Sequence, residues 1–176
     1  DTAAKRWPVL LRHSMRSYSH RNDATRIDAW RCHRDFLGAA LAAATGHRPV
    51  DAIGDIRLHD VIPEYGLVVL RDKMVDPLRA VRVAATGMHW VTELRGFLDR
   101  LVALAADNDD SEEAQLARAI LRSEAPLFET PNAKASGRFT AARLRETMPE
   151  PLRNYPNHYR HRLNQQLQYA NVDPEL

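Results

Sequence analysis

The chain has 176 residues, a length that suits one compact domain around a single hydrophobic core. Apolar residues make up 44% of it and charged residues 27%, which is ordinary for a globular protein and excludes a disordered one. No run approaches the roughly 18 apolar residues that span a bilayer, and the N-terminus lacks the layout of a signal peptide. Cys32 is the only cysteine, which excludes an intramolecular disulfide. We therefore expect a cytoplasmic protein without a membrane partner.

The formal net charge is only +2, but the charges are unevenly distributed. Acidic residues gather in 107–113, whereas the segment from Lys5 to Arg34 holds eight lysines and arginines against two aspartates. Such a stretch suits a polyanion such as DNA, because basic side chains displace condensed counterions from phosphates. A solvated helix face explains the same pattern equally well. We expect His13, His20 and His33, which are interspersed here, on the surface or facing DNA.

Residues 1–25 are basic and irregular, and we interpret them as a linker or arm before one domain over 26–176. From Arg26 to a stop at Gly46, apolar spacing of three and four predicts a helix. Its expected buried stripe is Ile27, Trp30, His33, Leu37, Ala40, Leu41 and Ala44. The short β-branched segments 66–70 and 80–84 then predict a small antiparallel sheet, with a further strand indicated by Ile56, Leu58 and Val61.

Helical spacing returns from Met88 to about Ala106, and a second helix is predicted to begin near Ser111. Residues 139–148 and the segment from Tyr159 to Ala170 also have helical patterns, separated by Pro149 and Pro151. We expect Trp30, Trp90 and Phe97 in the core. The predicted fold class is mainly α with a small antiparallel β-sheet, that is, α+β.

Three basic side chains lie at predicted element boundaries, where packing does not require them. Arg48 follows a helix end, Lys73 falls in the hairpin turn and Arg160 begins the last helix. Two arginines that converge on a phosphate, with a lysine near a leaving oxygen, would stabilise a phosphorane-like transition state without a metal. Scattered surface cations are the commoner explanation of such residues.

Three motifs in order resemble the catalytic domain of tyrosine recombinases of the phage-integrase type. The segment "LGAALAAATGHRPVDAI" resembles the family's first box, T-G-x-R-x-x-E, which makes Arg48 the first catalytic arginine and puts Asp51 where Glu is usual. The segment "GLVVLRDKMVDPLRAVRVAA" is similar to the β-hairpin whose turn carries the catalytic lysine, here Lys73. The resemblance spans roughly Ile27 to Leu176.

The third motif, "NHYRHRLNQQLQYANVDPEL", is similar to the second box, H-x-x-R-H followed by a helix and a G-V-D-P-E turn. It makes Arg160 the second catalytic arginine and His161 the histidine that often follows it. Asn157 stands where the family has its proton-handling histidine. Either Asn157 keeps that hydrogen bond without the proton transfer, or the neighbouring His158 takes over; we favour Asn157.

The resemblance implies DNA strand cleavage and rejoining through a 3'-phosphotyrosine in the complete protein, without cofactor or metal. None of the tyrosines here falls in the nucleophile's place: Tyr18, Tyr65, Tyr155, Tyr159 and Tyr169. We therefore expect this sequence to bind double-stranded DNA near a bacterial or phage nucleoid without cleaving it. Family members assemble as tetramers on DNA and exchange a C-terminal segment, so without that segment we expect a monomer.

Other functions are compatible with the same residues. The chain could be a DNA-binding or protein-interaction module with this fold that has lost the chemistry, or a helical scaffold unrelated to DNA. Strong salt dependence of DNA binding would separate the first two functions from the scaffold. His158 and His161 lie three residues apart and could ligate a metal, but no carboxylate at matching spacing and no cysteine accompanies them.

Overall fold

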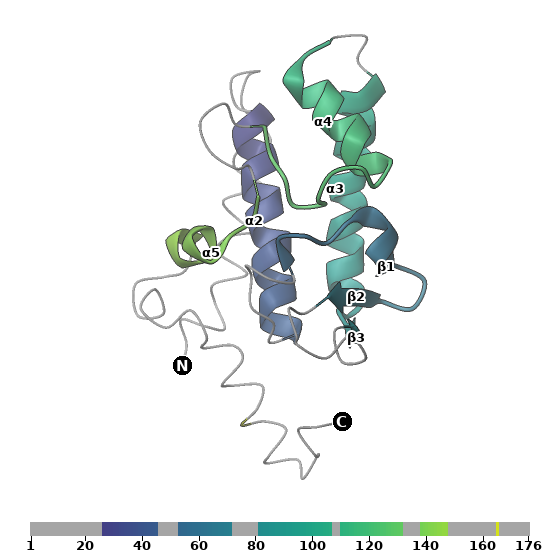
Figure 1. Cartoon of the computed structure of the whole chain (residues 1–176), viewed down its shortest axis with the longest axis vertical. Coiled ribbons are helices and arrows are strands. Elements are labelled where there is room, and N and C mark those ends of the chain that lie inside the picture. Colours follow the sequence, from purple (N-terminus) through teal and green to yellow (C-terminus); the bar gives the residue numbers. More distant parts are fainter. Residues whose placement is uncertain are drawn as a thin grey trace.

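The computed structural model describes residues 26–45, 53–71, 81–106, 110–131, 138–147 and Gln165. Its helices are α2 (Arg26–Thr45), α3 (Met88–Ala106), α4 (Glu112–Leu121) and α5 (Ala141–Thr147). A 3-10 turn, η3 (Leu58–Asp60), precedes strands β1 (Val61–Ile62), β2 (Leu67–Arg71) and β3 (Val81–Ala85). Figure 1 shows the sheet at the same end of the molecule as the C-terminal end of α2, with α4 at the opposite end. The predicted combination of helices with a small antiparallel sheet is confirmed.

The sheet has the order β1-β2-β3, and both of its strand pairs are antiparallel. The two segments predicted as strands form β2 and β3, each one residue later than expected. The third predicted strand is confirmed only at Val61 and Ile62. Before it, the backbone N–H of Arg57 donates to Asp60 Oδ2 at 3.0 Å. This bond accompanies the tight turn of η3, so Leu58 does not belong to a strand.

The core lies between α2, α3 and the inner face of the sheet. Leu37 and Leu41 of α2 are fully buried, as are Leu94 of α3 and Val68 and Leu70 of β2. Trp90 on α3 donates its indole N–H to the backbone oxygen of Leu37 on α2 at 3.0 Å, which satisfies the polar edge of a buried ring. The prediction that Trp30, Trp90 and Phe97 belong to the core is confirmed.

α4 packs against α3 and begins where the sequence predicts. The Ser111 hydroxyl accepts from the backbone N–H of Ala114 at 3.3 Å, which caps one of the free donors of the first turn. Arg118 donates to the backbone oxygen of Ala105 at 3.2 Å. The two helices therefore share polar contacts as well as a buried face.

Two expectations for α2 were wrong. His33 is buried and not on the surface or facing DNA, since it lies in the stripe that packs against α3. Ala44 is exposed although the stripe includes it, because helical spacing identifies a face but not how far along the helix that face is covered.

None of the helices in the described ranges has the length and apolar character that crossing a bilayer would require.

Gly38 lets the ring of Phe139 pack directly on α2. A Cβ at this position would lie 2.9 Å from Phe139 Cε1, whereas a Cβ at Gly96 on α3 would have no atom within 4 Å. We expect Gly38→Ala to destabilise the chain by about 1–3 kcal/mol, because overpacking outweighs the better helix propensity of alanine. Gly96→Ala, as the matched control, should stabilise it by about 0.5–1 kcal/mol. Urea unfolding of both variants checks this, and a stabilised Gly38→Ala would contradict it.

His33 should make the chain sensitive to mild acid. The pKa of His33 is lowered to about 4, first by burial, then by the charge of Arg100, against a hydrogen bond with the backbone of Glu93. The folded state favours the neutral ring. The contribution of neutral His33 to the free energy of unfolding is therefore present above the unfolded pKa of about 6.5 and is lost as pH falls through 4.

The stability lost between neutral pH and pH 4 should be about 3 kcal/mol, and a non-titrating His33→Leu variant should not show this loss. The measurement is the difference in free energy of unfolding between wild type and His33→Leu at neutral pH and near pH 4. A difference that stays constant with pH would contradict the prediction.

Candidate functional site

The site residues proposed from the motifs all lie outside the described residues: Arg48, Asp51, Lys73, Asn157, His158, Arg160 and His161. The structure describes the elements that lead to two of the segments carrying them. α2 ends at Thr45, three residues before Arg48. The last described pair of the β2–β3 ladder joins Arg71 to Val81, so the segment 72–80, which contains Lys73, connects two neighbouring antiparallel strands. Of the third motif only Gln165, helical and exposed, is described.

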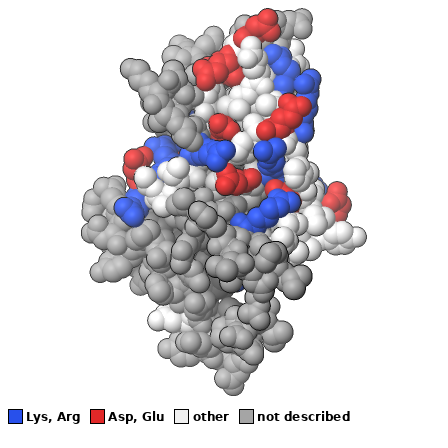
Figure 2. Space-filling model, viewed as in Figure 1, with Lys and Arg blue, Asp and Glu red and all other residues white. Residues whose placement is uncertain are grey.

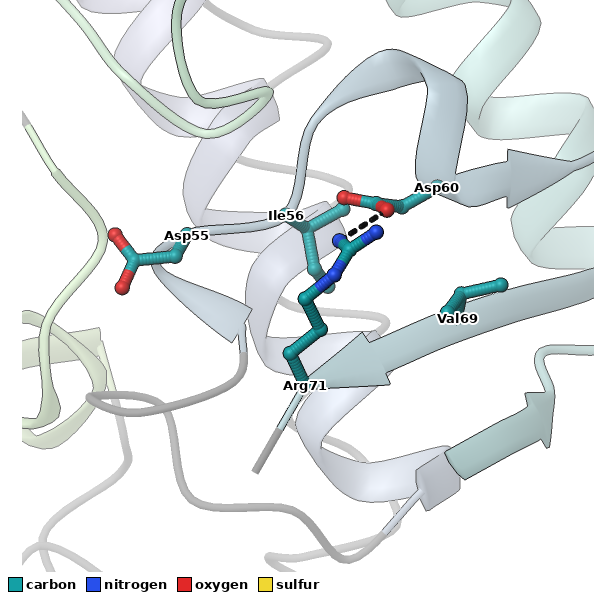
Figure 3. Close-up of a pocket in the computed structure, with 5 residues that line it drawn as sticks. All are labelled: Asp55, Ile56, Asp60, Val69 and Arg71. Carbon is teal, nitrogen blue, oxygen red and sulfur yellow. Dashed lines mark hydrogen bonds and ion pairs between the residues drawn. The ribbon is translucent and has the colours of Figure 1, made fainter. Parts of the chain in front are cut away.

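The strand end that leads to Lys73 is held by a buried carboxylate. Asp60 is only 2% exposed and forms an ion pair with Nη1 of Arg71, the last residue of β2. Figure 3 shows the two side chains pointing toward one another across a shallow pocket, with Asp55 turned away from them. His59 Nε2 also lies 3.6 Å from Asp60 Oδ1. Asp60 therefore connects the end of β2 to the η3 turn.

The η3 turn is in turn fixed to the end of α4. Arg57 donates through Nη1 to the backbone oxygen of Ser123 at 2.9 Å, and the N–H of His59 donates to the Ser123 hydroxyl at 3.1 Å. The N–H of Leu127 donates to the backbone oxygen of Ile56 at 2.6 Å. Ser123 adopts a left-handed conformation with φ of 60°, which a non-glycine residue rarely takes. These bonds give the base of the hairpin a rigid support from a distant part of the sequence.

A second polar cluster lies on α2 around Asp35, which is 1% exposed. Arg143 of α5 donates to Asp35 Oδ2 through Nη2 at 2.6 Å and Nε at 2.8 Å. Arg34 Nε lies 2.7 Å from Asp35 Oδ1, and Arg34 Nη1 donates to the backbone oxygen of Phe128 at 3.4 Å. The cluster thus joins α2 to α5 and to the segment after α4.

The cluster changes the proton affinity of both arginines. The hydrogen bond to Asp35 raises the pKa of Arg143, with burial opposing it, and Arg143 also pairs with Glu146 at 2.9 Å. Burial lowers the pKa of Arg34, and the adjacent Asp35 carboxylate opposes this. Both guanidinium groups stay charged, because an arginine pKa lies far above neutral pH. Asp35 is therefore a structural counter-ion, and nothing in its surroundings requires it to transfer a proton.

This cluster corrects the interpretation of the basic stretch from Lys5 to Arg34 for two of its residues, Arg31 and Arg34; residues 1–25 lie outside the described residues. Arg34 is buried against Asp35 and Phe139, and half-buried Arg31 donates to the backbone oxygen of Pro131 at 3.2 Å. These two arginines support the fold and do not form an open surface for a polyanion. In Figure 2 the described acidic and basic side chains are intermixed and do not separate into areas of one sign.

Sequence reasoning missed Asp35, Asp60, Arg71 and Arg143. One signal in the sequence could have identified Asp35, because the Arg34-Asp35 pair directly precedes the apolar residues Phe36 and Leu37 in the predicted helix. A charged pair inside a buried stripe needs partners, which the sequence cannot locate. Among the described residues, no three His, Cys, Asp or Glu side chains gather to hold a metal ion.

Comparisons with known proteins find no matching family model, no matching curated protein and no matching solved structure.

Replacing Asp35 should be costly. In Asp35→Asn the charge that neutralises two buried or half-buried arginines is lost, and we expect a destabilisation of about 3–5 kcal/mol. Asp55→Asn is the matched control, because Asp55 pairs with Arg138 at 2.8 Å with both side chains more than half exposed. Its effect should stay within about 1 kcal/mol. Thermal and urea unfolding measure both, and equal effects would contradict the role given to Asp35.

Proposed function

We propose that this chain is the DNA-binding portion of the catalytic domain of a site-specific tyrosine recombinase, with the fold of that domain. The observation that carries the proposal is the antiparallel pairing of β2 with β3 up to Arg71 and Val81, which flank the segment containing Lys73. The family motif requires a lysine between two such strands. α2, which is described as far as Thr45, leads to the segment that contains Arg48, and the family motif has an apolar helix before this arginine.

In this proposal the complete protein cleaves one DNA strand at a time. A tyrosine phenolate attacks the scissile phosphate, a 3'-phosphotyrosyl bond forms and the 5'-hydroxyl leaves, so the bond energy is kept for rejoining. Arg48 and Arg160 bind the non-bridging oxygens and Lys73 protonates the leaving oxygen. Asp51 orients Arg48 or braces the helix beneath it. His161 accompanies Arg160, and Asn157 or His158 occupies the place of the family's histidine.

A second function is favoured by one residue, Asn157. An amide can keep a hydrogen bond to a phosphate but cannot donate or accept a proton near neutral pH. The chain would then be a DNA-binding module of the same fold that does not cleave. In both functions the DNA partner places the protein with the nucleoid, in the cytoplasm of a bacterium or of a phage host.

DNA binding by the chain tests the proposal that both functions share. We expect its affinity for duplex DNA to fall steeply with salt, because binding releases counterions from phosphates. Arg48→Ala and Arg160→Ala should each weaken binding and reduce the slope of log affinity against log salt by about one. Arg122→Ala, at an exposed position after α4, is the control and should change neither. Salt-insensitive binding, or an equal effect of Arg122→Ala, would contradict the proposal.

Cleavage distinguishes the two functions. The full reading frame that encodes this chain should be incubated with nicked suicide DNA substrates, in which a covalent protein–DNA adduct accumulates. An adduct that depends on Lys73 and Arg160 supports a recombinase, and Asn157→His should then increase its rate. Binding without any adduct, in wild type and in Asn157→His alike, supports the module that does not cleave.

A further inference from the structure

Both faces of the sheet are largely apolar, with Arg71 as the charged side chain on the outer face. Its inner face presents Val61, Val68 and Leu70, which are buried. The register places a second set of apolar side chains on the outer face: Ile62, Leu67, Val69, Val81, Val83 and Ala85. Antiparallel sheets that face water on one side usually alternate apolar and polar residues. Here Arg71, opposite Val81, is the one charged residue among the strand residues of the outer face, and Val81 and Val83 remain 54% and 59% exposed.

β3 is the edge strand of this sheet, on the side away from β1 (Figure 1). The N–H of Thr86 donates to the backbone oxygen of Gly66 at 2.8 Å, which fixes the phase of the ladder. Hydrogen-bonded pairs alternate in an antiparallel ladder, so Ala84 and Arg82 direct their backbone groups to β2. Val81, Val83 and Ala85 direct theirs to the open edge, where no strand pairs with β3 within the described ranges.

This edge is complementary to itself. If two copies meet around a twofold axis at Val83, each Val83 lies opposite the other and Val81 lies opposite Ala85. Val81, Val83 and Ala85 are the residues whose N–H and C=O groups point outward. The pairs 83–83, 81–85 and 85–81 therefore exchange six backbone hydrogen bonds. Arg82 falls opposite Ala84, so no like charges face each other directly. The exposed apolar side chains of the two β3 strands become neighbours.

We propose that β3 is a docking edge for a second copy of this chain, which forms a twofold dimer with one continuous six-stranded antiparallel sheet. Exposed apolar edge strands pair readily with other strands unless charge, proline or a bulge prevents it. β3 contains no proline, and its one charged residue, Arg82, directs its backbone to β2 and not to the edge. The inference does not depend on the proposed function, and it differs from the monomer that the family resemblance implied.

The first measurement is the mass of the chain without DNA across a wide concentration range, by sedimentation equilibrium. We expect a concentration-dependent rise from the 20.0 kDa monomer toward twice that mass. Val83→Pro removes the N–H that points to the open edge and leaves the bonds to β2, so it should raise the dimer dissociation constant by about tenfold or more. Circular dichroism should show the same fold as wild type.

A pair of lysine variants gives a matched control for surface character. Val81→Lys places a charge on the docking edge, and Val102→Lys places one on α3 at the same exposure of 54%. The first should weaken dimerisation and the second should not. A monomer at every concentration, or a dimer that Val83→Pro and Val81→Lys leave unchanged, would overturn the proposal.

Cysteine cross-linking tests the register and remains informative if Val83→Pro fails to fold. Paired residues in the proposed dimer have Cα atoms about 5.5 Å apart, within the range of a disulfide. Val83→Cys should therefore cross-link to itself, and a mixture of Val81→Cys with Ala85→Cys should cross-link. Val81→Cys alone should not, since its two copies lie about 13 Å apart along the strands. Wild type, with only Cys32, gives the background, and equal cross-linking of all variants would exclude this register.

Discussion

The burial of one carboxylate, Asp35, constrains much of this structure. A charge in the middle of a helix that packs into the core is very costly unless it is paired and hydrogen-bonded. Asp35 is paired from two directions, by Arg34 on its own helix and by Arg143 on α5. The segment after α4 also packs beside this part of α2, because Arg34 donates to the backbone oxygen of Phe128 and Arg31 donates to that of Pro131. Helix α2 thus contributes both buried apolar side chains and the central carboxylate of an ion-pair cluster to the described fold.

Asp60 has a comparable role where the end of β2 meets the η3 turn. It is buried and paired with an arginine that is 59% exposed on its side chain, so one member of the pair belongs to the core and the other reaches the surface. Through Arg57, His59 and Ser123, the same junction is bonded to the end of α4. The root of the β2–β3 connection is therefore fixed by elements far from it in sequence. A surface segment can carry specific chemistry only when a rigid scaffold positions it.

The sequence predicted the helices and strands well because each has a strong local pattern. The spacing of Trp90, Leu94 and Phe97 identified α3, and Ser111 identified the start of α4. The helix predicted over 139–148 begins two residues later, at Ala141, because the Thr140 hydroxyl accepts from the N–H of Arg143 at 3.2 Å and Phe139 packs in the core beside Gly38. What could not be predicted is pairing across long distances in the chain. Nothing near Asp35 indicates that its partner is Arg143, and nothing near Asp60 indicates Arg71.

The same distinction between local patterns and long-range contacts applies to the candidate site. Motif order was sufficient to name Arg48, Lys73 and Arg160, since a resemblance depends on local letters. The Asp60–Arg71 pair at the strand end that leads to Lys73 depends on a tertiary contact, which a local motif does not contain. Arg34 illustrates the error this produces: charge counting assigned it to a basic surface, whereas burial makes it a partner of Asp35.

The distance in sequence between Asp35 and Arg143, 108 residues, also has a consequence for how the chain folds. Contacts between distant residues form only after the entropy of closing the intervening loop has been lost. During synthesis, the α3–α4 hairpin can form from neighbouring residues, whereas Asp35 of α2 lacks the two hydrogen bonds from Arg143 until α5 has emerged from the ribosome. Helix α5, which is synthesised last among the helices of the described fold, therefore completes the ion-pair cluster on the first of them, α2.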